Sequence, residues 1–196
     1  PISLLELVIW TGDSLEMWRD CLPQATVVGV DLQPPDLDLG ERVVIARGDQ
    51  SDGAFLHGLR AAHAPGGFDV IIDDASHLGQ LTARSLQHLY SEHLKPGGLY
   101  VIEDWGTGYL PSWPDGASIG APLDVENLDA GHPLPDEGGI SMPSHDVGMV
   151  GVVKRLVDHV AAGTIAALTP ALAGPVLPID SMTIRDGLVV LRKPSA

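Results

Sequence analysis

The chain has 196 residues and a formal net charge of −15, because 26 Asp and Glu side chains outnumber 11 Lys and Arg. This acidity argues against binding to nucleic acid or to an anionic membrane, since both interactions depend on Lys and Arg beside phosphate groups. One domain with a sizeable core is expected at this length. The single cysteine, Cys21, and the lack of a transmembrane-length apolar run or a basic leader indicate a cytoplasmic protein without a signal peptide.

The first part of the chain alternates between strand-like and helix-like segments. Apolar runs at residues 4–10, 25–30 and 43–46 predict three strands. Helical spacing over residues 15–20 and 52–63 predicts the helices that follow the first and third strands. This alternation is typical of a parallel sheet with crossover helices.

The stretch from 68 to 104 is the most informative part of the sequence. Strand-like runs at 70–72 and 99–102 are each followed by an acidic pair, and a helical pattern over 78–94 joins them. A strand–helix–strand crossover brings both strand ends to one edge of the sheet, where open α/β sheets bind ligands. The groups expected at that edge are Asp73, Asp74, Glu103, Asp104 and His77. Because clustered carboxylates repel one another, a hard divalent cation such as Mg²⁺ is their simplest partner.

The last part of the chain begins with a change in composition. Residues 105–148 are rich in Pro, Gly and Asp and lack periodicity, which predicts an irregular, lid-like insertion within a single domain, 1–196. A helix is predicted over 150–168, and strands at 181–185 and 188–192 flank an Asp-Gly turn. The whole pattern predicts an α/β fold with a doubly wound, mainly parallel seven-stranded sheet that ends in an antiparallel hairpin.

The strand ends also suggest the class of cofactor. The dinucleotide fingerprint G-x-G-x-x-G is absent from the first turn, where Gly12 stands alone. Asp31, however, ends the second strand, where an acidic residue commonly accepts hydrogen bonds from ribose hydroxyls. Asp49 ends the third strand and could serve an adenine edge or a backbone amide. This combination suits a nucleoside without a pyrophosphate, such as S-adenosylmethionine.

Several motifs together resemble the metal-dependent sugar O-methyltransferases of actinobacteria, which act on macrolide deoxysugars and on mycobacterial polysaccharides. The resemblance covers about residues 4–110 and the helix near 150–160. It implies a class I methyltransferase fold of Rossmann-like type, S-adenosylmethionine and Mg²⁺ as cofactors and a saccharide acceptor. A homo-oligomer, with a dimer as the first guess, is also expected. The motifs lie at residues 6–14, 28–31, 48–51, 73–77, 95–98 and 100–104.

The resemblance also implies roles for individual residues. Asp74, Glu103 and Asp104 match the magnesium ligands, and His77 matches the general base. Val8 departs from the pattern, since the first-turn motif usually has glycine there, and its side chain would crowd the cofactor. Residues that match the cofactor site are Glu6, Gly12 and Ser14 near the methionine part, Asp31 at the ribose, Asp49, Gln50 and Ser51 around adenine, and Asp73 by the amino acid group.

Other interpretations remain open at this point. Trp105, Tyr109 and Trp113 either pack the insertion or provide a ring on which a sugar stacks. Strand-end carboxylates are often only solvated loop residues. His132 and His145 are interpreted first as surface residues, with substrate contact as the second interpretation for both. The same machinery could act on a catechol, or the chain could be a non-catalytic S-adenosylmethionine-binding protein or a metal hydrolase.

Overall fold

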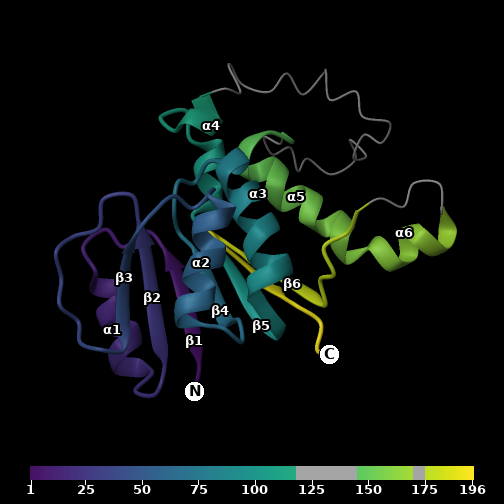
Figure 1. Cartoon of the computed structure of the whole chain (residues 1–196). Coiled ribbons are helices and arrows are strands. Elements are labelled where there is room, and N and C mark those ends of the chain that lie inside the picture. Colours follow the sequence, from purple (N-terminus) through teal and green to yellow (C-terminus); the bar gives the residue numbers. More distant parts are fainter. Residues whose placement is uncertain (118–144, 170–174) are drawn as a thin grey trace.

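The computed structural model describes residues 1–117, 145–169 and 175–196. Its centre is a seven-stranded sheet in the order β3-β2-β1-β4-β5-β7-β6 (Figure 1). The strands are β1 (Ser3–Leu7), β2 (Thr26–Asp31), β3 (Val43–Arg47), β4 (Phe68–Asp73), β5 (Leu94–Glu103), β6 (Ser181–Arg185) and β7 (Leu188–Arg192). The helices are α1 (Asp13–Cys21), α2 (Gly53–His63), α3 (Gly79–His88), α4 (Pro114–Ala117), α5 (Gly148–Val160) and α6 (Ala162–Leu168), with a π-helical turn η1 (Leu89–His93) and a 3₁₀ turn η2 (Trp105–Tyr109).

The topology confirms the predicted fold class. Strands β3, β2, β1, β4 and β5 pair in parallel, and β7 and β6 close the sheet as an antiparallel hairpin. The register places Leu7 of β1 beside Asp73 of β4, and Asp73 beside Ile102 of β5. The carboxyl ends of β1, β4 and β5 therefore lie together at one edge of the sheet, as the sequence predicted.

Helices cover both faces of the sheet, and the described residues form two hydrophobic cores. Alternate residues of each strand point to opposite faces. Leu5 of β1 joins the core beneath α2, α3 and α5, whereas Leu4 joins the core beneath α1, which contributes Leu15. This double covering explains why the central strands are near-continuous apolar runs.

The boundaries differ from the sequence prediction at the first strand. Residues 4–10 were predicted to be one strand, but β1 ends at Leu7. Val8 has a φ of 81° and Trp10 a φ of 47°, and a positive φ turns the chain away from the extended conformation of a strand. The remaining residues of the apolar run therefore form the turn above the end of β1.

Two predicted helices are also divided. The segment 78–94 consists of α3 followed by the π-helical turn η1. Residues 95–98 were predicted to stop that helix, but they lie within β5 as an irregularity, because pairing with β4 moves from Phe68–Leu94 to Val70–Leu99. The segment 150–168 is divided into α5 and α6 at Ala161.

The predicted irregular insertion is described only in part. Its first residues form η2 and α4, two short helical segments that the lack of periodicity did not predict. Residues 118–144, which include His132, lie outside the described residues, so the lid and the single domain 1–196 stay predictions. Within the described parts of the chain, none of the helices is long and apolar enough to cross a membrane.

Candidate metal and cofactor site

The carboxyl edge of β4 and β5 gathers a compact group of polar side chains. Asp74 follows β4, and Asp104 follows β5. One ligand atom each from Asp74, His77 and Asp104 lies within 4.8 Å of the others. His77 Nε2 is 3.8 Å from Asp74 Oδ1 and 4.0 Å from Asp104 Oδ2. The structure thus brings together three of the residues that the sequence assigned to the metal and the base.

Two of these residues have backbone conformations that are uncommon for side chains with a Cβ atom. His77 has a φ of 49° and Asp104 a φ of 50°. Holding a residue other than glycine in this left-handed region costs about 1–3 kcal/mol, and such residues cluster at functional sites. The conformations turn the chain sharply after each strand, and the two side chains converge on Asp74.

The electrostatics of the edge favour a bound cation. Burial, followed by the charge of Asp104, raises the pKa of Asp74, while His77 opposes the shift. Burial also raises the pKa of Glu103, with further contributions from Asp74 and Asp104. Glu103 therefore senses the same charges, although it lies outside the group within 4.8 Å. A divalent cation at this point would relieve the repulsion that adds to the effect of burial on these pKa values.

The ring of His77 is largely enclosed. Its side chain is 14% exposed, and its centroid lies 5.7 Å from that of Trp113. Nδ1 is buried without a hydrogen-bond partner among the described residues, whereas Nε2 faces the two carboxylates. The imidazole thus presents one nitrogen to the site.

Asp73 lies beneath this edge and not at its surface. It is 2% exposed and accepts hydrogen bonds from the hydroxyls of Ser85, at 2.7 Å, and Tyr100, at 2.8 Å. Burial raises its pKa, and the two hydroxyls oppose the shift. These contacts do not support the predicted contact with the amino acid group of the cofactor, because both carboxylate oxygens are buried. Asp73 instead connects β4 with α3 and β5, directly below Asp74.

Gln50 braces the loop that carries His77. Its Nε2 donates to Ser85 Oγ at 3.3 Å, and its Oε1 accepts from the backbone N–H of Ser76 at 3.2 Å. The neighbouring Asp49 is exposed and accepts from the backbone and hydroxyl of Ser51, which lowers the pKa of Asp49. Of the three residues predicted around adenine, Asp49 and Ser51 are thus the accessible ones.

A cavity of about 220 Å³ lies between the turn that follows β1 and Asp74, one of the predicted metal ligands. Glu6, at the floor, is 3% exposed and accepts hydrogen bonds from the hydroxyl of Ser14 and, at 2.7 Å, from the indole of Trp18. Gly12, with a φ of 93°, provides the backbone turn into α1. Burial raises the pKa of Glu6, and the nearby Asp74 and Glu103 add to the shift. The cavity is lined by Glu6, Val8, Ile9, Trp10, Thr11, Asp13, Ser14 and Asp74.

Val8, like Trp10, lines this cavity with a positive φ. Its φ of 81° is in a region that glycine adopts readily and that β-branched residues rarely occupy. The conformation explains why a glycine is expected at this position from the sequence resemblance. The valine side chain also occupies space in a cavity that is smaller than the roughly 300–1,000 Å³ of typical ligand sites.

Asp31 fixes the loop above the end of β2. Its Oδ2 accepts from the backbone N–H groups of Ile9, at 3.0 Å, and Trp10, at 3.3 Å, and its Oδ1 accepts from Gln33 at 2.8 Å. Burial opposes the shift, but these hydrogen bonds together lower the pKa of Asp31. A carboxylate has about four acceptor positions, so Asp31 can still accept from a ribose hydroxyl.

The three predicted substrate residues form a row of rings that begins at Trp105, the residue after Asp104. Trp105 and Tyr109 have centroids 6.1 Å apart, and those of Tyr109 and His145 are 4.9 Å apart. The indole N–H of Trp105 donates to the backbone carbonyl of Arg185 at 3.0 Å. His145 is only 9% exposed, so its interpretation as a surface residue is wrong, because it packs edge-on against Tyr109.

Asp115 is a structural residue that the sequence did not reveal. Its Oδ2 accepts from the backbone N–H groups of Gly79, at 2.7 Å, and Met149, at 2.8 Å, which begin α3 and α5. A Cβ atom added at Gly79 would overlap the backbone of Gly148. These residues are far apart in the chain, so neither a local motif nor helical spacing could reveal the contact.

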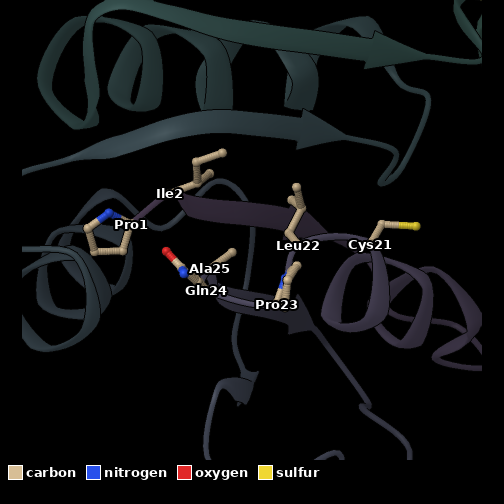
Figure 2. Close-up of a pocket in the computed structure, with 7 residues that line it drawn as sticks. All are labelled: Pro1, Ile2, Cys21, Leu22, Pro23, Gln24 and Ala25. Atoms are coloured by element: carbon tan, nitrogen blue, oxygen red, sulfur yellow. The ribbon is translucent and has the colours of Figure 1, made fainter.

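A larger cavity lies at the opposite end of the strands. It has a volume of about 460 Å³ and is lined by Pro1, Ile2 and residues 21–25 (Figure 2). Because it adjoins the amino ends of β1 and β2, it is separated from the edge where the carboxylates gather. Although this cavity is the larger of the two, its distance from the carboxylates argues against it as the active site.

Comparisons with known proteins find similarity to curated O-methyltransferases. The chain is 33% identical over 150 residues to demethylmacrocin O-methyltransferase of Streptomyces fradiae, which covers 76% of this chain and 31% of that protein. It is 30% identical over 201 residues to 8-demethyl-8-(2-methoxy-alpha-L-rhamnosyl)-tetracenomycin-C 3'-O-methyltransferase of Streptomyces olivaceus, covering 98% of this chain and 45% of the relative. No family model matches the chain.

The solved structures agree with these relatives. The fold superimposes on MycE methyltransferase from the mycinamycin biosynthetic pathway, in complex with Mg and SAH, with a TM-score of 0.72 and 27% identity. The match covers 99% of this chain and 46% of that protein. The chain thus spans less than half the length of each of these three proteins.

Proposed function

From its relationship to the sugar O-methyltransferases of actinobacteria, we propose that this chain carries out S-adenosylmethionine-dependent methylation of a sugar hydroxyl with the help of Mg²⁺. The observation that carries the proposal is the convergence of Asp74, His77 and Asp104 within 4.8 Å at the carboxyl edge of the sheet. Two carboxylates from adjacent strand ends supply the oxygen ligands that Mg²⁺ prefers. Glu103, which shares their electrostatic environment, is the third proposed ligand.

The residues of the site have distinct roles in this proposal. A magnesium ion, when bound, lowers the pKa of a coordinated hydroxyl and orients its oxygen. His77 accepts the hydroxyl proton at Nε2, the nitrogen that faces the carboxylates. Enclosure of the ring beside Trp113 holds that nitrogen in place. The hydroxyl oxygen then forms a bond to the methyl carbon as the bond from that carbon to sulfur breaks.

The cofactor is proposed to lie between the turn that follows β1 and the proposed metal ligands Asp74 and Asp104. Glu6, Gly12 and Ser14 border the cavity or shape its turn, and Asp31 lies at the adjacent strand end. Because the cavity reaches Asp74, a methyl group held there would be close to the proposed metal ligands. The accessible Asp49 and Ser51 remain the proposed neighbours of adenine.

The acceptor is proposed to be a sugar of a glycoside, such as an antibiotic sugar. The named substrates of the relatives include a rhamnosyl tetracenomycin. The ring row of Trp105, Tyr109 and His145 begins at the residue after Asp104 and offers flat apolar surface. Tyr109 is 39% exposed and is therefore the ring most accessible to a sugar. A homo-oligomer and a cytoplasmic location stay predictions.

The test is methyl transfer from labelled S-adenosylmethionine to a panel of glycosides and catechols, with Mg²⁺ and with excess chelator. We expect transfer to glycosides only when Mg²⁺ is present. Transfer to catechols alone would replace the sugar assignment, and full activity in chelator would overturn the metal role. Cofactor binding by calorimetry without transfer to any acceptor would favour the non-catalytic alternative, for which the strained Val8 in the small cavity is the supporting observation.

A further inference from the structure

A second group of metal-binding side chains lies away from the proposed active site. His57 of α2 and Glu92 and His93 of η1 each place a ligand atom within 4.8 Å of the others. The turn η1 directly precedes β5, so this group lies near the amino end of that strand. Asp74 and Asp104 lie at the carboxyl ends of the strands, so the two groups are at opposite edges of the sheet.

His93 provides an independent indication of a ligand. It is 1% exposed, and both ring nitrogens are buried without a hydrogen-bond partner among the described residues. Buried polar atoms in proteins are nearly always paired, so an imidazole with two unpaired nitrogens calls for an explanation. Its Nε2 faces Glu92 Oε2 at 3.9 Å, and its ring centroid is 5.9 Å from that of His57. One nitrogen of the buried ring thus lies within 4.8 Å of a donor atom from each of the other two residues.

We propose that His57, Glu92 and His93 bind a divalent transition-metal ion of the Zn²⁺ class. Two imidazoles and one carboxylate are donors that suit zinc, whereas Mg²⁺ prefers a set made of oxygens alone. Such a three-ligand site leaves the fourth position of the ion to water. The side chains of His57 and Glu92 are exposed, so that position faces the solvent.

The geometry requires only a small adjustment. Ligand atoms around a tetrahedral zinc ion are about 3.4 Å apart, given metal–ligand distances of about 2.1 Å. The present separations reach 4.8 Å at most. Since His57 and Glu92 are exposed, a change of rotamer in those two side chains can close the site around the buried His93 without moving the core.

The charged groups around His93 have opposing effects on its pKa and on the attraction of a cation. Burial lowers the pKa of His93, and Arg60, His57 and His88 lower it further, while Glu92 opposes them. A lowered pKa favours the neutral imidazole, which is the form that binds metal. The guanidinium of Arg60 weakens the attraction for a cation, and the carboxylate of Glu92 offsets it.

A metal ion here would link α2 to the connection between α3 and β5. Its consequence is greater stability of the folded chain, because a ligand that binds only the folded state shifts the unfolding equilibrium. The turn η1 is π-helical, a rare conformation that is often found at functional sites. The inference does not depend on the methyl transfer proposed above.

The test uses the whole chain with saturating Mg²⁺, so that the carboxylate edge is occupied. Zn²⁺ is titrated by calorimetry and Co²⁺ by its visible absorption, and the melting temperature is measured with and without Zn²⁺. We expect one Zn²⁺ per chain, a higher melting temperature and a Co²⁺ spectrum typical of mixed nitrogen and oxygen ligands. His57→Ala and Glu92→Gln should each weaken Zn²⁺ binding at least tenfold, on the order of a lost ligand contact.

His63→Ala is the matched control, because His63 is an exposed histidine at the end of the same helix. Both test variants change exposed side chains, so we expect them to fold as wild type does. A variant of the buried His93 would instead risk unfolding the chain. Unchanged Zn²⁺ affinity in His57→Ala and Glu92→Gln would overturn the proposal. Loss of Zn²⁺ binding in Asp74→Asn but not in His57→Ala would also overturn it, since the ion would then occupy the other edge.

Discussion

Replacing Asp74 by asparagine should change the stability of the folded chain in opposite directions with and without Mg²⁺. In wild type, an oxygen of Asp74 lies within 4.8 Å of an oxygen of Asp104. Asparagine keeps the shape of the side chain and removes one of the two charges. The variant should therefore be more stable than wild type without metal and less stable with it.

The magnitude follows from the distance and the exposure. At 4.8 Å, two like charges repel by about 0.9 kcal/mol in water and by about 3.5 kcal/mol at an effective dielectric constant of 20. The side chains of Asp74 and Asp104 are 40% and 66% exposed, so the smaller figure is closer. A gain of about 1 kcal/mol raises the melting temperature of a chain of this size by about 2–4 °C.

The assay is thermal unfolding at pH 8, where ordinary imidazoles are neutral, in chelator and in saturating Mg²⁺. At a Mg²⁺ concentration of 100 times Kd, binding stabilises wild type by about 2.7 kcal/mol. That corresponds to a rise of about 5–10 °C in its melting temperature. The rise should be absent in Asp74→Asn. Asp158→Asn, on the exposed side of α5, changes the net charge by the same amount and should behave as wild type in both buffers.

The pH dependence provides a second measurement of the same effect. The pKa values of Glu6, Asp74 and Glu103 are raised in the folded chain, so each group binds its proton more tightly when folded. Their contribution to metal-free stability is complete below their ordinary pKa values and is lost as the pH rises through the raised ones. Equal melting temperatures for wild type and Asp74→Asn in chelator, together with equal responses to Mg²⁺, would refute this account.

Three further outcomes are expected. Val8→Gly should raise the urea midpoint of unfolding, because it relieves about 1–3 kcal/mol of backbone strain at an entropy cost of about 0.5–1 kcal/mol for glycine. It should also tighten S-adenosylmethionine binding, because it removes a side chain from the cavity. A lower midpoint with unchanged affinity would contradict this prediction. Asp31→Ala should weaken cofactor binding, measured by calorimetry, at least tenfold, on the order of a lost charge-assisted hydrogen bond. The loss should be larger than in Asp31→Asn. Equal affinities of wild type and Asp31→Ala would count against the ribose role. His77→Ala should lower turnover by about 10²–10⁴-fold with Mg²⁺ affinity retained, whereas loss of Mg²⁺ affinity would make His77 a ligand instead of a base.

The sequence by itself determined the architecture and the edge where the site lies. Alternation of short apolar runs with helical spacing specifies parallel strands, and parallel strands place their carboxyl ends together, so Asp74, Glu103 and Asp104 could be assigned to one place before any coordinates. Asp31 was found in the same way, from its position after the second strand. The predicted positions at the strand ends agree with the structure because they rest on local periodicity and chain direction, whereas the roles of these residues stay predictions.

Only the tertiary structure decided what each side chain does at that edge. Asp73 and Asp74 are neighbours in sequence, but the pleat of β4 buries the first against Ser85 and Tyr100 and leaves the second at the surface. The capping of two helices by Asp115 and the meeting of His57 with His93 join distant parts of the chain. Local patterns carry no information on such contacts, because packing between elements determines which side chains meet.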